Sequence, residues 1–293
     1  MATENIDHTT SPFNHYTKKN TNLPSLSKNI NRLLRALNDT NSNHQQLTEI
    51  IMMFPEISTR LIFLANSAWA SPARPVTSIE QACFILGHSI VKSISFGISI
   101  SSCFDTRKCP GFKVDRFWTT AILVSKGTGL LASRLSDKME CYDFEQTLQS
   151  AGLLHNIGLL WLADSLPKET NKALQELATE PALTVNEALI QYTGTDYCEV
   201  GGWLCTQLSF PEVLSVAIKY QLDNNYQESY WKIALLVGAA ASMVAALYDR
   251  SDQVPENTRL NKLGVDYVTQ DIIFKELADN FVKTQDLVKN MFV

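Results

Sequence analysis

Apolar side chains recur along this chain at intervals of three and four residues, which is the periodicity of one face of an α-helix. Alternation with a period of two, which is typical of a half-buried strand, does not persist over any long stretch. The first three apolar faces are formed by Ile30, Leu33, Leu34 and Leu37, by Leu47, Ile50 and Ile51, and by Ile57, Leu61 and Leu64. The pattern therefore predicts an all-α fold.

Proline and glycine divide the apolar pattern into separate helices. Pro55 stands at a helix start, residues 70–77 hold two prolines and form a predicted loop, and Gly87 is expected to end a helix. Further helices are expected at 78–86, 88–104, 116–135, 144–163, 166–179, 231–249 and 268–291. The segment Gly127-Thr128-Gly129 lies inside one of them and indicates close helix packing.

Four helix starts carry the sequence of a capping box, in which Ser, Thr or Asp begins a helix and Glu or Gln follows three residues later. The four pairs are Ser78 and Gln81, Thr184 and Glu187, Asp196 and Glu199, and Ser209 and Glu212, the last with Pro211 in its first turn. Each box is expected to satisfy backbone N–H groups that the first helical turn leaves without a partner.

A polar segment at residues 105–113, which includes Pro110-Gly111, is the predicted boundary between two packed helical subdomains. Residues 1–22 are polar and form a predicted flexible tail. The expected organisation is the tail 1–22, a first helical subdomain 23–106, a second helical subdomain 107–250 and a C-terminal helical segment 251–293.

The composition is that of an ordinary globular protein. Of the 293 residues, 45% are hydrophobic and 19% are charged, which provides the apolar surface for a core. The net charge is −5 and no dense run of Lys and Arg occurs, whereas proteins that bind nucleic acids usually present a basic face. We therefore expect no nucleic-acid partner.

The sequence also bears on the cellular compartment. The N-terminus lacks the apolar core of a signal peptide. The longest nearly apolar run, residues 233–248, is shorter than the roughly 20 residues that a membrane-spanning helix needs. The six cysteines include no CxxC pair, and Cys83 and Cys205 lie in apolar helical segments where buried, reduced thiols are expected. These features predict a cytoplasmic protein without membrane insertion.

Two blocks of sequence resemble a known family. The first contains Leu64-Ala65-Asn66-Ser67-Ala68-Trp69 and, after the proline loop, Ser78-Ile79-Glu80-Gln81-Ala82 and Ile85-Leu86-Gly87; the second is Gly152-Leu153-Leu154-His155-Asn156-Ile157-Gly158. Together they resemble the HDOD family, the HD-related output domains, whose patterns read L-x-x-A-N-S-A, S-I-x-x-A and G-L-L-H-D-I-G.

Weaker motifs lie in the same order along the chain. They are Leu23-Pro24-Ser25-Leu26, Trp118, Glu199-Val200-Gly201-Gly202-Trp203-Leu204 and the segment 211–220. The resemblance covers about residues 23–250. It implies two packed helical subdomains, the second an HD-like helical bundle, and a role in bacterial signal transduction.

The second subdomain is similar to the HD and HD-GYP phosphohydrolases, whose chemistry needs a divalent metal ion. Asn156 replaces the aspartate of the His-Asp pair, and only His155 of that pair remains. Thr120, Tyr197 and Gln221 stand where the resemblance places further histidines. Because a catalytic metal usually needs about three protein ligands, we assign no catalytic residue, no metal ligand and no cofactor.

Six residues of the family motifs are candidate site residues: Asn66, Ser67, Gly87, Trp118, Gly152 and His155. Asn66 is expected to end a helix, and the alternative is a contact to a ligand or partner at the junction of the two halves. His155 is expected to be a buried neutral histidine bonded to a backbone carbonyl, and the alternative is a weak contact to a metal or an anion.

Three functions stay open at this level. The first is a non-catalytic signalling or scaffold module that contacts unidentified signalling proteins, with a homodimer as one form of such contact. The second is a metal-dependent phosphohydrolase that uses a different ligand set, drawn from Asp143, Glu145, Asp196 and Glu199. The third is a sensor of small molecules or nucleotides, with a pocket between the halves lined by Trp69, Trp118, Trp161 and Trp203.

Overall fold

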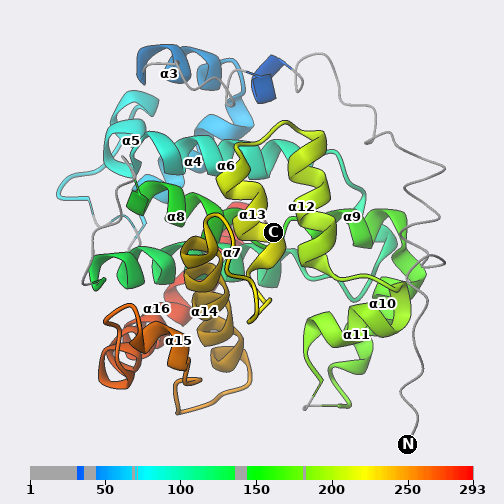
Figure 1. The fold of residues 1–293 in the computed structure, drawn as a ribbon. Coiled ribbons are helices and arrows are strands. Elements are labelled where there is room, and N and C mark those ends of the chain that lie inside the picture. The colour runs from blue at the N-terminus through cyan, green and yellow to red at the C-terminus, as the bar shows by residue number, and fades with distance from the viewer. Residues whose placement is uncertain are drawn as a thin grey trace, which may run out of the picture.

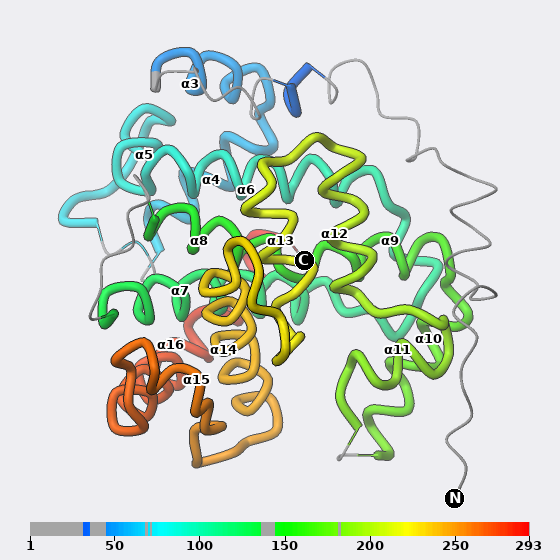
Figure 2. Tube along the Cα trace, viewed as in Figure 1, coloured from blue at the N-terminus to red at the C-terminus, as the bar shows by residue number. Residues whose placement is uncertain are grey.

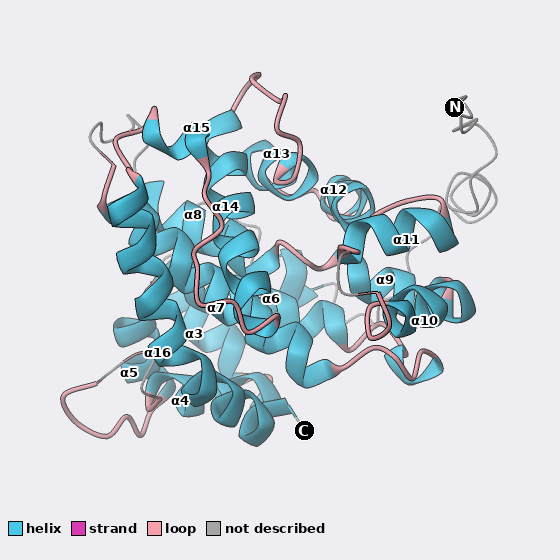
Figure 3. Cartoon of the chain, turned by 90° about the horizontal axis from the view of Figure 1, so that it is seen from below, coloured by secondary structure: helices cyan, strands magenta, loops and turns pink. Residues whose placement is uncertain are grey.

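The computed structural model describes residues 32–35, 44–67, 70, 72–135, 144–180 and 183–292. In these residues helices are joined by loops and turns, and no strand occurs among them (Figure 3). The all-α prediction is therefore confirmed. The predicted tail 1–22 lies outside the described residues.

Helices of the N-terminal half lie together along one side of the molecule (Figure 1). They are α3 (His44–Met52), α4 (Pro55–Ala65), α5 (Ile79–Leu86) and α6 (His88–Ser101). The buried residues of the predicted apolar faces are Leu33, Leu34, Leu47, Ile51, Ile57, Leu61 and Leu64. Two further members of the first face, Ile30 and Leu37, lie outside the described residues.

Asn66 ends α4 and holds the loop that follows it. Its Nδ2 donates to the carbonyl oxygens of Ile62 at 2.9 Å and Val76 at 2.7 Å, and its Oδ1 accepts from the Val76 N–H at 2.8 Å. The Ser67 hydroxyl donates back to the Leu64 carbonyl oxygen at 2.6 Å. These bonds all go to the local backbone, which supports the structural interpretation of both residues.

Gly87 separates α5 from α6. Its φ of +81° lies in the left-handed region that favours glycine, and the two helices meet there at a bend of 112°. The break is therefore where the sequence predicts it. The helix that follows ends at Ser101, earlier than the predicted residue 104.

The helix α7 (Val114–Ser133) is the centre of the second half, and α8 (Phe144–Leu154) and α14 (Trp231–Tyr248) pack along it (Figure 2). Glycines permit this close approach. A Cβ on Gly127 would lie 3.1 Å from the Ala240 Cβ on α14, and a Cβ on Gly152 would lie 3.0 Å from the Ser125 Cα on α7. The close packing expected around Gly127 is therefore present.

Five shorter helices complete the second half. They are α9 (Gly158–Ser165), α10 (Pro167–Glu176), α11 (Val185–Thr193), α12 (Tyr197–Gln207) and α13 (Glu212–Tyr220). The single helix predicted at 144–163 is wrong, because the structure divides it into α8 and α9 at residues 155–157. At Gly158 the backbone of α12 approaches so closely that a Cβ would collide with the Tyr197 carbonyl oxygen.

The predicted capping boxes form to different extents. The box of Thr184 and Glu187 is present with both of its hydrogen bonds. Ser78 caps α5 and accepts from the Gln81 N–H, but the Gln81 side chain accepts from the Thr77 N–H instead of closing the box.

The other two boxes depart further from the prediction. Asp196 caps α12 without the return bond, since the Glu199 carboxylate accepts from the Thr195 hydroxyl at 2.7 Å. The box expected at Ser209 is wrong. Ser209 adopts a left-handed φ of +55° in the turn after α12, and Pro211 itself stands at the N-cap of α13, which has no side-chain cap.

The chain ends in α16 (Tyr267–Phe292), which packs along α7 and reaches α4 at its C-terminal end. There the Phe292 ring stacks on the Trp118 ring, with centroids 4.2 Å apart and planes 7° apart. The Arg60 guanidinium of α4 lies 4.5 Å from the Phe292 ring centroid. The last helix therefore ties the two halves together. Two short elements were not predicted: a 3-10 turn at Thr106–Lys108 and α15 (Thr258–Asn261).

Among the described residues, α14 is the single helix long and apolar enough to cross a membrane, and 61% of it is buried inside the structure. The pair α5 and α6 would qualify only as a joined span, and it is sharply bent. The helix α14 packs against α7 and α13, so it lies in the fold as a core helix.

Candidate functional site

His155 lies in the turn between α8 and α9 and is only 2% exposed. Its Nδ1 lies 2.7 Å from the Gly152 carbonyl oxygen. Because a carbonyl only accepts, Nδ1 carries the proton, and Nε2 of the neutral ring is left as an acceptor. Burial lowers the pKa of His155 from 6.5 to about 4, so the ring is uncharged at neutral pH.

The residue after His155 fastens the same turn to α7. The Asn156 Nδ2 donates to the Phe117 carbonyl oxygen at 3.2 Å. The Asn156 Oδ1 is buried and has no hydrogen-bond partner among the described residues. An amide in this position supplies the N–H donor to α7, which an ionised aspartate could not supply.

Gln221, at the end of α13, also holds this turn by hydrogen bonds. Its Nε2 donates to the carbonyl oxygens of His155 at 2.8 Å and Ile218 at 2.9 Å. The side chain is 5% exposed. Gln221 therefore positions the His155 backbone, and it does so from one of the positions where the resemblance expects a histidine.

Tyr197 and Thr120 complete the set of substituted positions. Tyr197 is buried at the start of α12, and its ring centroid lies 6.4 Å from that of His155. Burial raises the pKa of the Tyr197 hydroxyl well above its usual value, so it stays protonated. The Thr120 hydroxyl on α7 donates to the Tyr248 hydroxyl at 3.5 Å. The structure thus brings all five positions that were singled out from the sequence into one region.

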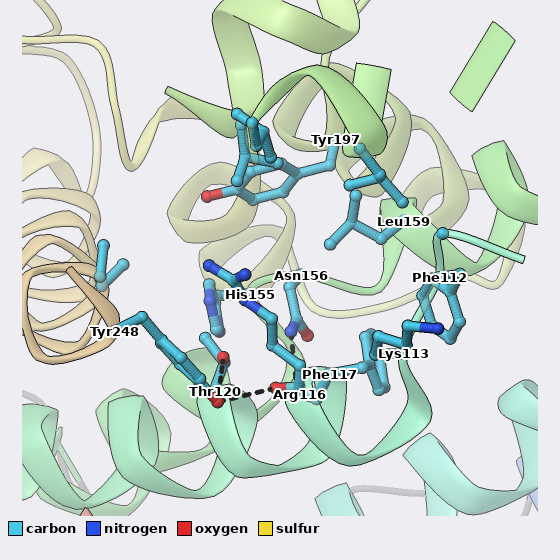
Figure 4. Close-up of a pocket in the computed structure, with 16 residues that line it drawn as sticks. Phe112, Lys113, Arg116, Phe117, Thr120, His155, Asn156, Leu159, Tyr197 and Tyr248 are labelled. Atoms are coloured by element: carbon cyan, nitrogen blue, oxygen red, sulfur yellow. Dashed lines mark hydrogen bonds between the residues drawn. The ribbon is translucent and has the colours of Figure 1, made fainter. Parts of the chain in front are cut away.

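A cavity of about 170 Å³ opens beside this turn (Figure 4). Thr120, His155, Asn156 and Tyr197 are among its lining residues. Three further polar side chains of the lining were missed at the sequence level: Arg116, Lys113 and Tyr248. The Arg116 guanidinium lies 4.4 Å from the Tyr248 ring centroid. The spacing of Arg116 and Thr120, one turn apart on α7, is the signal that could have found this cationic residue.

The cavity does not fit a catalytic metal ion. Among the described residues, no group of three His, Cys, Asp or Glu side chains could hold one. The Asp196 carboxylate accepts from the N–H groups of Cys198 at 2.7 Å and Glu199 at 2.8 Å, so it serves as a helix cap. Asp143, which was part of the alternative ligand set, lies outside the described residues. The donors present are amides, hydroxyls and one imidazole, which are a poor set for a divalent cation without a carboxylate.

The thiols near the cavity are also poorly suited to chemistry. Burial raises the pKa of the Cys198 thiol far above its usual value and that of Cys205 to about 12. A thiol is nucleophilic only as the thiolate, and neither residue forms one near neutral pH. The expectation that Cys83 and Cys205 are buried is confirmed.

The three described tryptophans of the predicted pocket do not line this cavity. Trp161 and Trp203 pack against each other at 5.6 Å between ring centroids, and Trp161 is fully buried in the core. Trp118 borders a second cavity of about 190 Å³ between the halves, next to Phe292. Trp69 lies outside the described residues.

Comparisons with known proteins agree with this architecture. The family described as the HDOD domain matches residues 23–224. A comparison with curated proteins found no match.

Three solved structures share the fold. A protein of Marinobacter aquaeolei VT8, provisionally named a signal transduction protein, is 21% identical in sequence and has a TM-score of 0.76. The match covers 92% of this chain and only 60% of the Marinobacter chain. A protein of Shewanella amazonensis SB2B, provisionally named a phosphohydrolase, is 23% identical with a TM-score of 0.72 over 96% of this chain and 99% of its own. An HDOD domain protein of unknown function from Geobacter sulfurreducens is 21% identical with a TM-score of 0.72 over 96% of this chain and 97% of its own.

Proposed function

The chain belongs to the HDOD family, and from this premise we propose that it is a non-catalytic signalling module of the bacterial cytoplasm that acts through protein contacts. The Marinobacter protein, whose provisional name refers to signal transduction, supports the signalling part of this proposal. Its partners are other signalling proteins or a second copy of the chain.

One observation carries the non-catalytic part of the proposal. The positions where related hydrolases would hold a metal are occupied here by groups with other tasks. Asn156 donates to the backbone of α7, and Gln221 donates to the His155 carbonyl oxygen. An ionised aspartate at position 156 would lack the N–H donor, so the turn between α8 and α9 is held in part by the substitution that depletes the metal set.

Hydrolysis of a chromogenic phosphodiester tests this proposal. We expect that bis(4-nitrophenyl) phosphate with added Mn²⁺ or Fe²⁺ is hydrolysed by the protein no faster than by buffer and metal alone. The variant Asn156→Ala is the matched control and is expected to give the same background. A metal-dependent rate in the wild type that Asn156→Ala removes would contradict the proposal, because it would place a working metal site at this turn.

A further inference from the structure

The charged side chains that line the cavity are of one sign. Arg116 and Lys113 line it, and none of its lining residues is Asp or Glu. In the part of the chain that the structure describes, no carboxylate forms an ion pair with Arg116, whose guanidinium instead lies against the Tyr248 ring. Lys113 donates to the Pro110 carbonyl oxygen at 3.0 Å, and no described carboxylate pairs with it. Among the described residues, the cavity therefore offers two positive charges that lack an anionic partner.

The placement of Arg116 directs this charge into the cavity. Its side chain extends from α7 across the opening toward Tyr197, as Figure 4 shows. Thr120 follows Arg116 by one helical turn on the same side of α7, and its hydroxyl also lines the cavity. A guanidinium beside hydroxyl groups matches the geometry of a carboxylate or phosphate, which accepts two parallel N–H bonds from arginine.

Apolar side chains form another part of the cavity lining, which we call the apolar wall. They are Phe112, Leu159, Leu174, Leu177 and Val185. The cavity volume of about 170 Å³ is close to the roughly 150 Å³ of an apolar cavity that holds one benzene molecule. One planar ring therefore fits against this wall, and a longer ligand would project through the opening beside Arg116.

One imidazole nitrogen offers an acceptor to the cavity. The His155 ring lines the cavity, and its Nε2 is left as an acceptor because Nδ1 donates to the Gly152 carbonyl oxygen. The Asn156 Oδ1 is too deeply buried to be reached by a ligand. A ligand N–H or O–H group can therefore donate to the His155 Nε2, and a ring nitrogen with a hydrogen-bond partner is favoured over one without.

We propose that this cavity binds a small organic anion, made of one planar ring that carries a carboxylate or phosphate and a hydrogen-bond donor. The anionic group pairs with Arg116, the ring packs on the apolar wall, and the donor reaches the His155 Nε2. The proposal rests on the proposed function in one respect, since the positive charge comes from Arg116 and not from a metal ion. It gives the non-catalytic module a ligand to sense.

Binding of 4-hydroxybenzoate, measured by a ligand-observed NMR titration of the full chain, tests the proposal. We expect a dissociation constant of about 1 mM or tighter for a ligand of this size. The neutral isostere 4-hydroxybenzamide is expected to bind at least about tenfold more weakly, because it lacks the charge that pairs with Arg116. Acetate, which lacks the ring, is expected not to bind. Phenyl phosphate in a parallel titration shows which of the two anionic groups the cavity prefers.

Two variants and one control place the binding in this cavity. Arg116→Gln, at an exposed position, is expected to weaken 4-hydroxybenzoate at least about tenfold, and Ala245→Phe is expected to abolish binding by filling the cavity from α14. Lys262→Gln removes an exposed positive charge outside the cavity and is expected to change nothing. Equal binding of the neutral isostere, or binding that survives both cavity variants, would overturn the proposal. It would also be overturned if neither anion bound at 10 mM, a concentration set about tenfold above the expected dissociation constant.

Treatment with EDTA separates the two proposals. Binding that EDTA leaves unchanged supports an anion site made by Arg116. Binding that EDTA abolishes and Mn²⁺ restores would mean that a metal ion holds the anion, and it would overturn this inference and the non-catalytic function together. Absence of binding with and without Mn²⁺ would overturn the inference alone.

Discussion

Replacing Gly238 with alanine is expected to lower the free energy of unfolding by at least about 3 kcal/mol, or to prevent folding altogether. Gly238 lies in the middle of α14, where a Cβ would collide with the Gln221 carbonyl oxygen. The obstacle is backbone, so no change of side-chain rotamer relieves it. The gain of roughly 1 kcal/mol that alanine normally brings to a helix interior does not offset this cost.

The same substitution is expected to disturb the candidate site. Gln221 holds the His155 carbonyl oxygen, and a shift of α13 away from α14 moves that donor. Urea unfolding followed by circular dichroism measures the change in stability. The control is Ser242→Ala, one turn further along α14 at an exposed position, which is expected to stay within about 0.5 kcal/mol of the wild type. An unchanged urea midpoint for Gly238→Ala would show that α13 and α14 are not in this close contact.

Removing the imidazole at position 155 is expected to flatten the dependence of stability on pH. The pKa of His155 is about 4 in the folded protein and 6.5 in the unfolded chain. Between these values the unfolded chain binds a proton that the folded protein does not bind. The contribution of the neutral His155 ring to the free energy of unfolding is therefore fully present above pH 6.5. It is progressively lost as the pH falls toward 4.

From pH 7 to pH 5 this linkage amounts to about 2 kcal/mol of the free energy of unfolding. We expect the wild type to lose that much more stability over this interval than His155→Gln, whose side chain does not titrate. For each protein we take the change in the free energy of unfolding between pH 7 and pH 5 and compare the two changes. This comparison cancels the cost of the substitution itself and the carboxylate titrations that both proteins share. Parallel pH profiles for the two proteins would show that His155 is not buried as a neutral ring.

Local sequence predicted the helices well because their signals are local. The apolar spacing of Leu47 and Ile51 and the position of Pro55 depend only on neighbouring residues, and each lies where expected. The break at residues 155–157 was missed because the sequence around it is continuously apolar and helical. The contacts that break the helix come from α7 and α13, which are distant in the sequence.

The candidate site was predicted only in part, because some of its residues are brought together by contacts that are distant in the sequence. The family motif pointed to His155 and Asn156, and matching of motif positions led to Thr120, Tyr197 and Gln221. Arg116 was not found, because a single exposed arginine at the start of a helix looks like any solvated charge. Its importance depends on Tyr248 of α14 and on the apolar wall, and most of these residues are distant from Arg116 in the sequence and lie beside it only in the fold.

The non-catalytic function is tested most directly by the metal content of protein purified without chelators and without a metal-binding tag, determined by plasma mass spectrometry. We expect less than about 0.1 equivalent of Fe, Mn, Zn, Ni or Co per chain, because the described residues at the turn of His155 and Asn156 lack the roughly three ligands that a catalytic metal needs. One or two whole equivalents, lost on His155→Gln, would contradict it and place a metal centre at this turn.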